Sequence, residues 1–156
     1  MGNPELKELL DRHEIAGLVD RLGLWLDEKR FDEAPTILTE DATAETPGGT
    51  ARGLEAVVEQ ARRSHGEEVG TQHAITNKVI DLEGDRASVG ANLLATFFDP
   101  GQRSAPRRQL GERYAFEVVR TPDGWRISSV KTTPLWTLGE APQRSTGLRS
   151  GLDTIR

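Results

Sequence analysis

The stretch TQHAITNKVIDLEGDRASVGANLLATFF, residues 71–98, decides the fold class of this 156-residue chain. Its two segments, 71–82 and 86–98, alternate apolar and polar residues with the period of two that is typical of β-strands. The Glu-Gly-Asp sequence between them is a tight-turn signal, so the stretch predicts a long β-hairpin. Similar patterns predict strands at 109–120 and 125–133, joined by a Thr-Pro-Asp-Gly turn. The second half of the chain is therefore expected to form an antiparallel meander.

The first half of the chain is predicted to be mostly helical. Asn3 and Pro4 form a typical helix start, because an asparagine side chain caps free backbone N–H groups and proline fits the first helical position. Apolar residues recur at helical spacing from there to Leu26, and shorter helical segments are expected at 31–38 and 54–65. Helices followed by strands indicate a segregated α+β domain. A curved antiparallel sheet must bury its concave face, and these helices are the available cover.

The chain is expected to hold a single domain, 1–138, because it shows neither an internal repeat nor a domain linker. Between the helical segments, a short strand is predicted at 41–46 and a loop at 47–53. The remaining residues, 139–156, form a polar tail rich in Gly, Ser, Thr and Arg. We expect this tail to be mobile or to act as a lid.

The charge and composition of the chain disfavour several classes of partner and of chemistry. Its 20 basic and 25 acidic residues give a net charge of −5, which argues against nucleic acid and anionic membranes as partners. Cysteine is absent, so disulfides, thiol nucleophiles and cysteine metal sites are excluded. The first residues are too charged for a signal peptide, and no apolar run is long enough to span a bilayer. We therefore expect a cytoplasmic protein.

Strand alternation predicts which side chains face the interior of the domain. In the strand at 71–82 the more apolar set includes His73 and Asn77, and we expect both to point inward. The alternation changes phase after Val79, which predicts a β-bulge near residues 79 and 80, and bulges bend sheets. Buried polar side chains must pair with one another or face a wet cavity.

The next two strands predict a pocket beside these side chains. Three of the six inward positions of the strand at 86–98 are alanine, and small side chains on a concave face leave room for a ligand. In the strand at 109–120, Glu112 and Tyr114 fall on the inward face. The interior is thus expected to be apolar with four polar side chains, His73, Asn77, Glu112 and Tyr114.

Four segments together resemble a known family: LDEKRFDEAPTILTEDATAE (26–45), GTQHAITN (70–77), LEGDRASV (82–89) and DGWRI (123–127). Their order and spacing resemble the SnoaL-like branch of the nuclear transport factor 2-like superfamily, which includes polyketide cyclases, scytalone dehydratase and ketosteroid isomerase. The likeness spans roughly residues 10–137. It implies a cone-shaped, curved sheet that N-terminal helices close over a deep internal pocket.

The resemblance to scytalone dehydratase is strongest at two residues. Asp27 matches the catalytic aspartate of that enzyme, and His73, which follows a Thr-Gln pair, matches its first catalytic histidine. Three other features of that site are missing. Leu26 stands where that family has a tyrosine before the aspartate, and the second histidine is replaced in the region of Phe97 and Phe98. The second, water-orienting tyrosine of that family falls near Thr46 of this chain. The chain therefore matches half of the dehydratase active site.

Each of these residues also has a purely structural interpretation. A single inward histidine is by default a hydrogen-bonded core residue, and Asp27 lies off the apolar stripe of its helix, as a solvated carboxylate would. Trp25 and Trp136 are typical packing residues, although they would also suit the walls of an aromatic pocket. Glu112 could act as a second acid or pair with an arginine at the surface. His13 and His65 resemble surface or helix-end residues, and the sequence shows no metal-ligand pattern.

The sequence supports two hypotheses of different classes. The first is a cofactor-free cyclase, dehydratase or isomerase, in which Asp27 and His73 perform acid–base chemistry on a small apolar polyketide-like or aromatic carbonyl compound. Its substrate-binding residues would be Trp25, Asn77, Phe97, Glu112, Tyr114 and Trp136, with no metal. The second is a non-catalytic ligand-binding protein or a small subunit of a ring-hydroxylating oxygenase. A hydrolase of epoxide-like substrates is a weaker third hypothesis. The half-polar outer face of the sheet predicts a homodimer or homotrimer.

Overall fold

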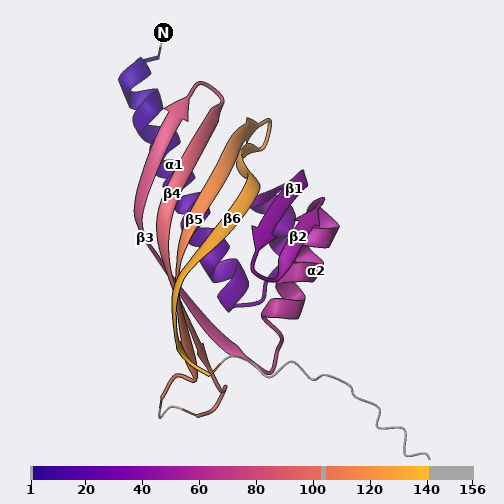
Figure 1. Ribbon diagram of the computed structural model, residues 1–156. Helices are drawn as coiled ribbons and strands as arrows, with labels where there is room; N and C mark the ends of the chain where they lie inside the picture. The colour runs from indigo at the N-terminus through magenta and orange to yellow at the C-terminus, as the bar shows by residue number, and fades with distance from the viewer. Residues whose placement is uncertain (1, 103–104, 141–156) are drawn as a thin grey trace, which may run out of the picture.

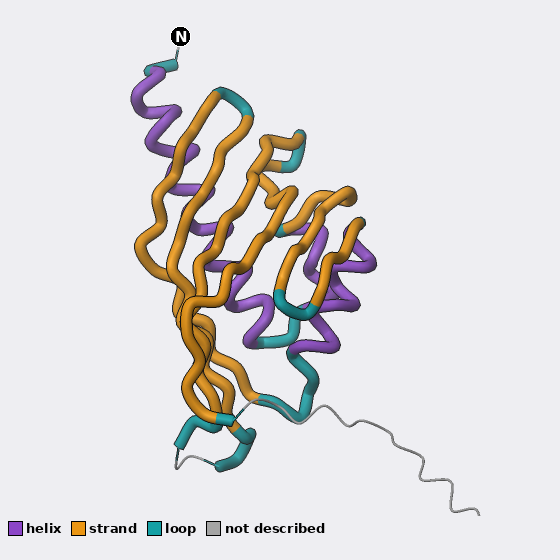
Figure 2. Tube along the Cα trace, viewed as in Figure 1, coloured by secondary structure: helices purple, strands orange, loops and turns teal. Residues whose placement is uncertain are grey.

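The computed structural model describes residues 2–102 and 105–140, and it confirms the α+β class as a curved, unclosed sheet with helices on one face (Figure 1). The elements in chain order are α1 (Pro4–Asp27), the 3₁₀ helix η1 (Phe31–Thr36), β1 (Leu38–Thr46), β2 (Gly49–Arg52), α2 (Leu54–Ser64), β3 (Gly70–Glu83), β4 (Arg86–Phe98), β5 (Arg108–Thr121) and β6 (Gly124–Gly139). Figure 2 shows the same trace by secondary structure. The predicted tail at 139–156 lies outside the described residues from residue 141 onward.

The six strands lie in the order β2-β1-β6-β5-β4-β3. All neighbouring pairs are antiparallel except β1 and β6, which run parallel, so the expectation of a wholly antiparallel sheet is wrong at that pair. Residues 47–53, predicted to be a loop, contain β2, and the last strand continues beyond residue 133 to Gly139. The hairpin of β3 and β4 is confirmed, with Gly84 at a positive φ of 61° in its turn.

Helix α1 begins where the sequence predicts. The Asn3 side chain accepts hydrogen bonds from the backbone N–H groups of Glu5 and Leu6, and Pro4 occupies the first helical position. The middle of α1 lies across the inner face of the sheet (Figure 1), where its apolar residues meet those of the strands. The largest fully buried side chains of this core are Ile15, Leu18, Val19, Val89, Phe116, Val118, Trp125 and Ile127. Among the described residues, no helix is long and apolar enough to cross a membrane.

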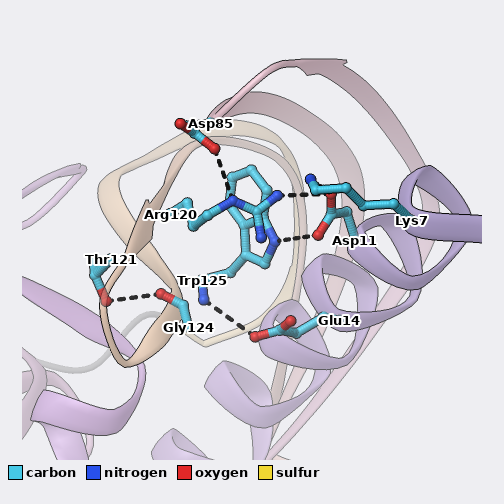
Figure 3. A network of polar contacts seen from close by, with 8 residues as sticks. All are labelled: Lys7, Asp11, Glu14, Asp85, Arg120, Thr121, Gly124 and Trp125. Carbon is cyan, nitrogen blue, oxygen red and sulfur yellow. Dashed lines mark hydrogen bonds and ion pairs between the residues drawn. The ribbon is translucent and has the colours of Figure 1, made fainter. Parts of the chain in front are cut away.

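A buried polar network fixes α1 to the ends of β5 and β6 (Figure 3). Asp11 accepts hydrogen bonds from Trp125 Nε1 at 3.1 Å, from Arg120 Nη2 at 2.7 Å and from Lys7 Nζ at 2.9 Å. The Arg120 guanidinium also lies over the Trp125 ring at 4.5 Å and donates to Asp85. The hydrogen bond from Arg120 is the main reason that the pKa of Asp11 is held well below its usual range.

We expect Asp11→Ala to lower the free energy of unfolding by about 2–3 kcal/mol, because it leaves Trp125 Nε1 and Arg120 Nη2 without their acceptor. The contribution of Asp11 is present above about pH 4 and is lost as the pH falls below it, because the unfolded carboxyl then takes up a proton first. Urea unfolding at neutral pH measures the loss. The control is Glu59→Ala, which breaks an exposed pair with Arg63 and should change stability by less than about 0.5 kcal/mol. Equal losses in the two variants would contradict the prediction.

Candidate active site

The last turns of α1 pack on the first half of β3 at Gly23, which carries no side chain. A Cβ atom at Gly23 would lie 3.3 Å from Ile75 Cδ1 and 3.6 Å from His73 Cβ, so the helix packs tightly on the strand at this position. One helical turn further on, α1 ends at Asp27. The close approach at Gly23 therefore brings the Asp27 carboxylate to β3.

Asp27 and His73 form a direct side-chain contact, as the resemblance implied. Asp27 Oδ1 lies 2.6 Å from His73 Nδ1 and accepts a second hydrogen bond from Thr71 Oγ1 at 3.0 Å, while Oδ2 accepts from the His73 backbone N–H at 2.8 Å. The His73 side chain is 3% exposed and that of Asp27 is 17% exposed. His73 is thus held by both its backbone and its ring.

The protonation of this pair follows from its hydrogen bonds. Burial alone would raise the pKa of the Asp27 carboxyl, but the hydrogen bonds from the side chain and backbone of His73, together with Thr71, outweigh burial and lower that pKa. An ionised carboxylate only accepts hydrogen bonds, so the proton between the two side chains sits on His73 Nδ1. In the neutral imidazole the other nitrogen, Nε2, then carries a free lone pair, which is the form that a general base requires.

The neighbouring strands place one small and three larger side chains opposite the residues around His73. Ala95 of β4 pairs with His73, and Phe97 pairs with Thr71. On β5, Glu112 pairs with Leu93 and Tyr114 pairs with the small Ala91. Glu112 and Tyr114 are both buried, which confirms their predicted inward direction.

Burial perturbs the two polar side chains that β5 contributes. It raises the pKa of Glu112, although the charges of His73 and Arg108 and the nearby Thr132 oppose the rise. It also raises the pKa of Tyr114, and the negative charges of Glu112 and Asp27 add to that effect. Carboxyl groups with a raised pKa are typical candidates for proton donors.

A second imidazole lies beside His73, where the sequence predicted only a helix-end residue. His65, just after α2, has its ring centre 5.2 Å from that of His73, and it stacks on Phe97 at 6.5 Å. Its Nδ1 lies 3.0 Å from the carbonyl oxygen of Ala61. Because a carbonyl can only accept, Nδ1 carries the proton and Nε2 is the acceptor. Burial, followed by the charge of His73, lowers the pKa of His65 to about 4, so this ring is neutral at pH 7.

We expect His65 to make stability depend on pH in a way that His65→Phe removes. The pKa of His65 falls from an ordinary 6.5 to about 4 in the folded chain, so the unfolded chain takes up the proton first as the pH drops. The stabilisation is therefore complete above about pH 6.5 and is lost toward pH 4. Between pH 7 and pH 5 the native protein should lose about 2 kcal/mol more than His65→Phe, which keeps the stacking on Phe97. Urea unfolding at both values measures this, and the same pH dependence in both proteins would contradict it.

The predicted inward direction of Asn77 is wrong, and Trp136 lies away from the contact between Asp27 and His73. The irregularity in β3 lies between Thr76 and Val79, earlier than expected, and Asn77 sits within it at a φ of 55° with an exposed side chain. Trp136 is 49% exposed and covers Gly111 on the outer face of the sheet, the face opposite α1. In β6 the register shifts opposite Gly111 and Glu112, which the sequence did not indicate.

The remaining sequence predictions have mixed outcomes. Trp25 is buried and packs edge-to-face on Phe31 with ring centres 5.4 Å apart, as a packing residue would. The expected internal pocket is not confirmed. Two hollows, of about 360 and 520 Å³, are lined mainly by outer-face and loop residues. In the described part of the chain, no three Asp, Glu, His or Cys side chains form a cluster that could hold a metal ion.

The sequence did not indicate two residues of this site. Thr71 shares the inward alternation of His73, and that signal could have found it. His65 carries no periodic signal, because it follows the end of α2.

Comparison with known proteins agrees with this architecture. The model of the SnoaL-like domain family matches residues 7–131. An uncharacterized protein of Mycobacterium tuberculosis is 30% identical over 125 residues, which cover 77% of this chain and 82% of that relative. The crystal structure of a Kribbella flavida protein is 31% identical with a TM-score of 0.75, and the match covers 84% of this chain and 95% of that one.

A more distant structure comes from Novosphingobium aromaticivorans and is provisionally assigned as a scytalone dehydratase. It is 20% identical with a TM-score of 0.75, and the match covers 86% of this chain and 90% of that one. At this identity the likeness shows a shared fold.

Proposed function

Because this chain belongs to the SnoaL-like domain family, we propose that it is a cofactor-free acid–base enzyme, a cyclase, dehydratase or isomerase that acts on a small apolar carbonyl compound. The substrate would be polyketide-like or aromatic. The observation that carries the proposal is the contact between Asp27 and His73, in which a carboxylate fixes the tautomer of a buried imidazole. The fold by itself serves many functions, so the proposal depends on this geometry.

In the proposed reaction, His73 Nε2 removes a proton from the carbon next to the substrate carbonyl. Asp27 stays ionised and stabilises the imidazolium that forms, since its Oδ1 already accepts the Nδ1 proton. The protonated His73 then returns the proton to another carbon, or to a hydroxyl group that leaves as water. Glu112 is a second proton donor in this scheme, because burial raises its pKa. Such general acid–base help is worth about 10²–10⁴-fold in rate.

A panel of aryl and cyclic ketones in D₂O tests the proposal across the expected class of substrates. A catalyst that removes a proton next to a carbonyl exchanges it for deuterium, and mass spectrometry detects the gain. We expect the native protein to accelerate deuterium uptake by at least one compound above the buffer rate. Acceleration by His73→Gln to the same extent would contradict the proposal.

A second candidate function is a non-catalytic binding protein or a subunit of a ring-hydroxylating oxygenase. Leu26 stands where the dehydratases have a tyrosine, and the His73 side chain is almost wholly covered, as a structural residue would be. Purification from the native cell separates the two candidates. Isolation with a larger oxygenase-type partner favours the subunit, whereas ketone exchange by the isolated protein favours the enzyme.

We also propose that the outer face of the sheet pairs with a second copy of the chain. Leu135 is 54% exposed and lies with Trp136 and Leu94 around the smaller hollow of that face. Exposed apolar side chains that gather in this way are typical of interaction surfaces. Sedimentation equilibrium should show a dimer or trimer, and a monomer at every concentration would contradict this pairing.

A further inference from the structure

Lys29 and Arg108 each have a buried side-chain nitrogen that lacks a hydrogen-bond acceptor. Among the described residues, the buried side-chain nitrogens of charged groups without a partner are Lys29 Nζ and Arg108 Nε. Folded proteins normally supply an acceptor for such atoms, because a buried donor without one costs free energy, and a charged donor costs more. Where the protein itself supplies none, a bound ligand can supply the acceptor.

Lys29 is the stronger indication of the two. Arg108 has further N–H groups, and its guanidinium lies 5.9 Å from the centre of the Phe97 ring, so part of its charge is already accommodated. The Lys29 ammonium has a single nitrogen, and that nitrogen is both buried and without a partner.

The chain holds Lys29 in a defined place beside the candidate active site. It follows Asp27 by one intervening residue, its φ is 54°, and its backbone N–H donates to the carbonyl of Leu26 at 3.4 Å. A lysine in this left-handed conformation is uncommon, and such residues often lie at functional sites. The charge of Lys29 contributes to the low pKa of His65, so the ammonium is within electrostatic reach of that ring.

We propose that Lys29 binds an ionised oxygen of the ligand, an enolate or phenolate oxygen, beside the imidazoles of His73 and His65. The inference builds on the proposed function and narrows its substrate class. When His73 Nε2 takes the proton from carbon, the electron pair of the broken C–H bond moves into the enolate. The negative charge then rests on the former carbonyl oxygen, where the Lys29 ammonium donates a hydrogen bond and keeps its own protons.

The probe for this site is 4-nitrophenol, because its ionised form absorbs visible light and its neutral form does not. We expect the native protein to bind the ionised form preferentially, and Lys29→Gln to weaken binding of that form by about ten- to hundredfold. Lys29→Arg should retain most of the affinity, since it keeps the charge. Lys131→Gln is the matched control, because Lys131 is 53% exposed and pairs with Glu45 on the surface.

Two results would overturn the inference: no binding of the ionised probe by the native protein, or equal binding by Lys29→Gln. Urea unfolding of Lys29→Gln checks that a loss of binding does not reflect unfolding. The binding assay needs no turnover, so its outcome is independent of the ketone panel. Lys29-dependent binding without ketone exchange would support the anion site and contradict the enzyme. Ketone exchange by the native protein, together with equal probe binding by Lys29→Gln, would support the enzyme and contradict the anion site.

Discussion

Replacing His73 by glutamine should slow deuterium uptake by the best ketone substrate by about 10²–10⁴-fold, because glutamine cannot accept the proton that His73 Nε2 takes up. The side chain is 3% exposed, and glutamine keeps much of its volume, so the fold should persist. The measurement is the uptake rate at saturating substrate, with urea unfolding of the same samples.

The matched control for this prediction is His13→Gln, since His13 lies on α1 with an exposed side chain. This variant should keep the native rate and the native stability. A rate for His73→Gln within about threefold of the native rate would remove His73 from the chemistry, since general acid–base help is worth far more.

Replacing Asp27 by asparagine should lower the same rate by about a hundredfold or more. Asp27→Asn removes the negative charge that fixes the His73 tautomer and stabilises the imidazolium during the reaction. It also weakens the tie between α1 and β3, because the carboxylate accepts hydrogen bonds from Thr71 and from the His73 backbone. We expect a loss of about 1–3 kcal/mol in unfolding free energy.

The double variant separates a shared role from two independent ones. If Asp27 acts through His73, then Asp27→Asn combined with His73→Gln should be no slower than His73→Gln alone. Asp20→Asn on the same helix is the control, because Asp20 is 55% exposed and pairs with Lys78 at the surface. Rate losses that multiply in the double variant would show that the two residues act separately.

Local patterns predict the sheet of this protein better than its site. The long hairpin and the inward direction of His73, Glu112 and Tyr114 follow from residue alternation, because each strand is buried on one face. The same alternation misplaced Asn77, since the irregularity in β3 begins two residues earlier than the apolar pattern indicates. The position of a bulge depends on how two strands pair, so the residue pattern of one strand does not determine it.

The residues around His73 depend on tertiary packing that periodicity does not contain. Helical spacing placed Asp27 off the apolar stripe, and only the resemblance predicted its contact with His73. The position off the stripe and the contact with His73 are compatible, because Asp27 is the last residue of α1. The helix packs on β3 at Gly23, one turn earlier, and this brings the Asp27 carboxylate to the strand. His65 and Lys29 follow helix ends, where no repeating pattern gives the direction of a side chain.

The tautomer of His73 is the property on which the proposed chemistry depends most directly, and ¹⁵N NMR of histidine-labelled protein measures it. At a pH where the ring is neutral, we expect a proton on Nδ1, bound to Asp27, and an unprotonated signal from Nε2. Asp27→Asn should weaken this preference. A proton on Nε2 in the native protein would contradict the proposal, because His73 could not then act as the base.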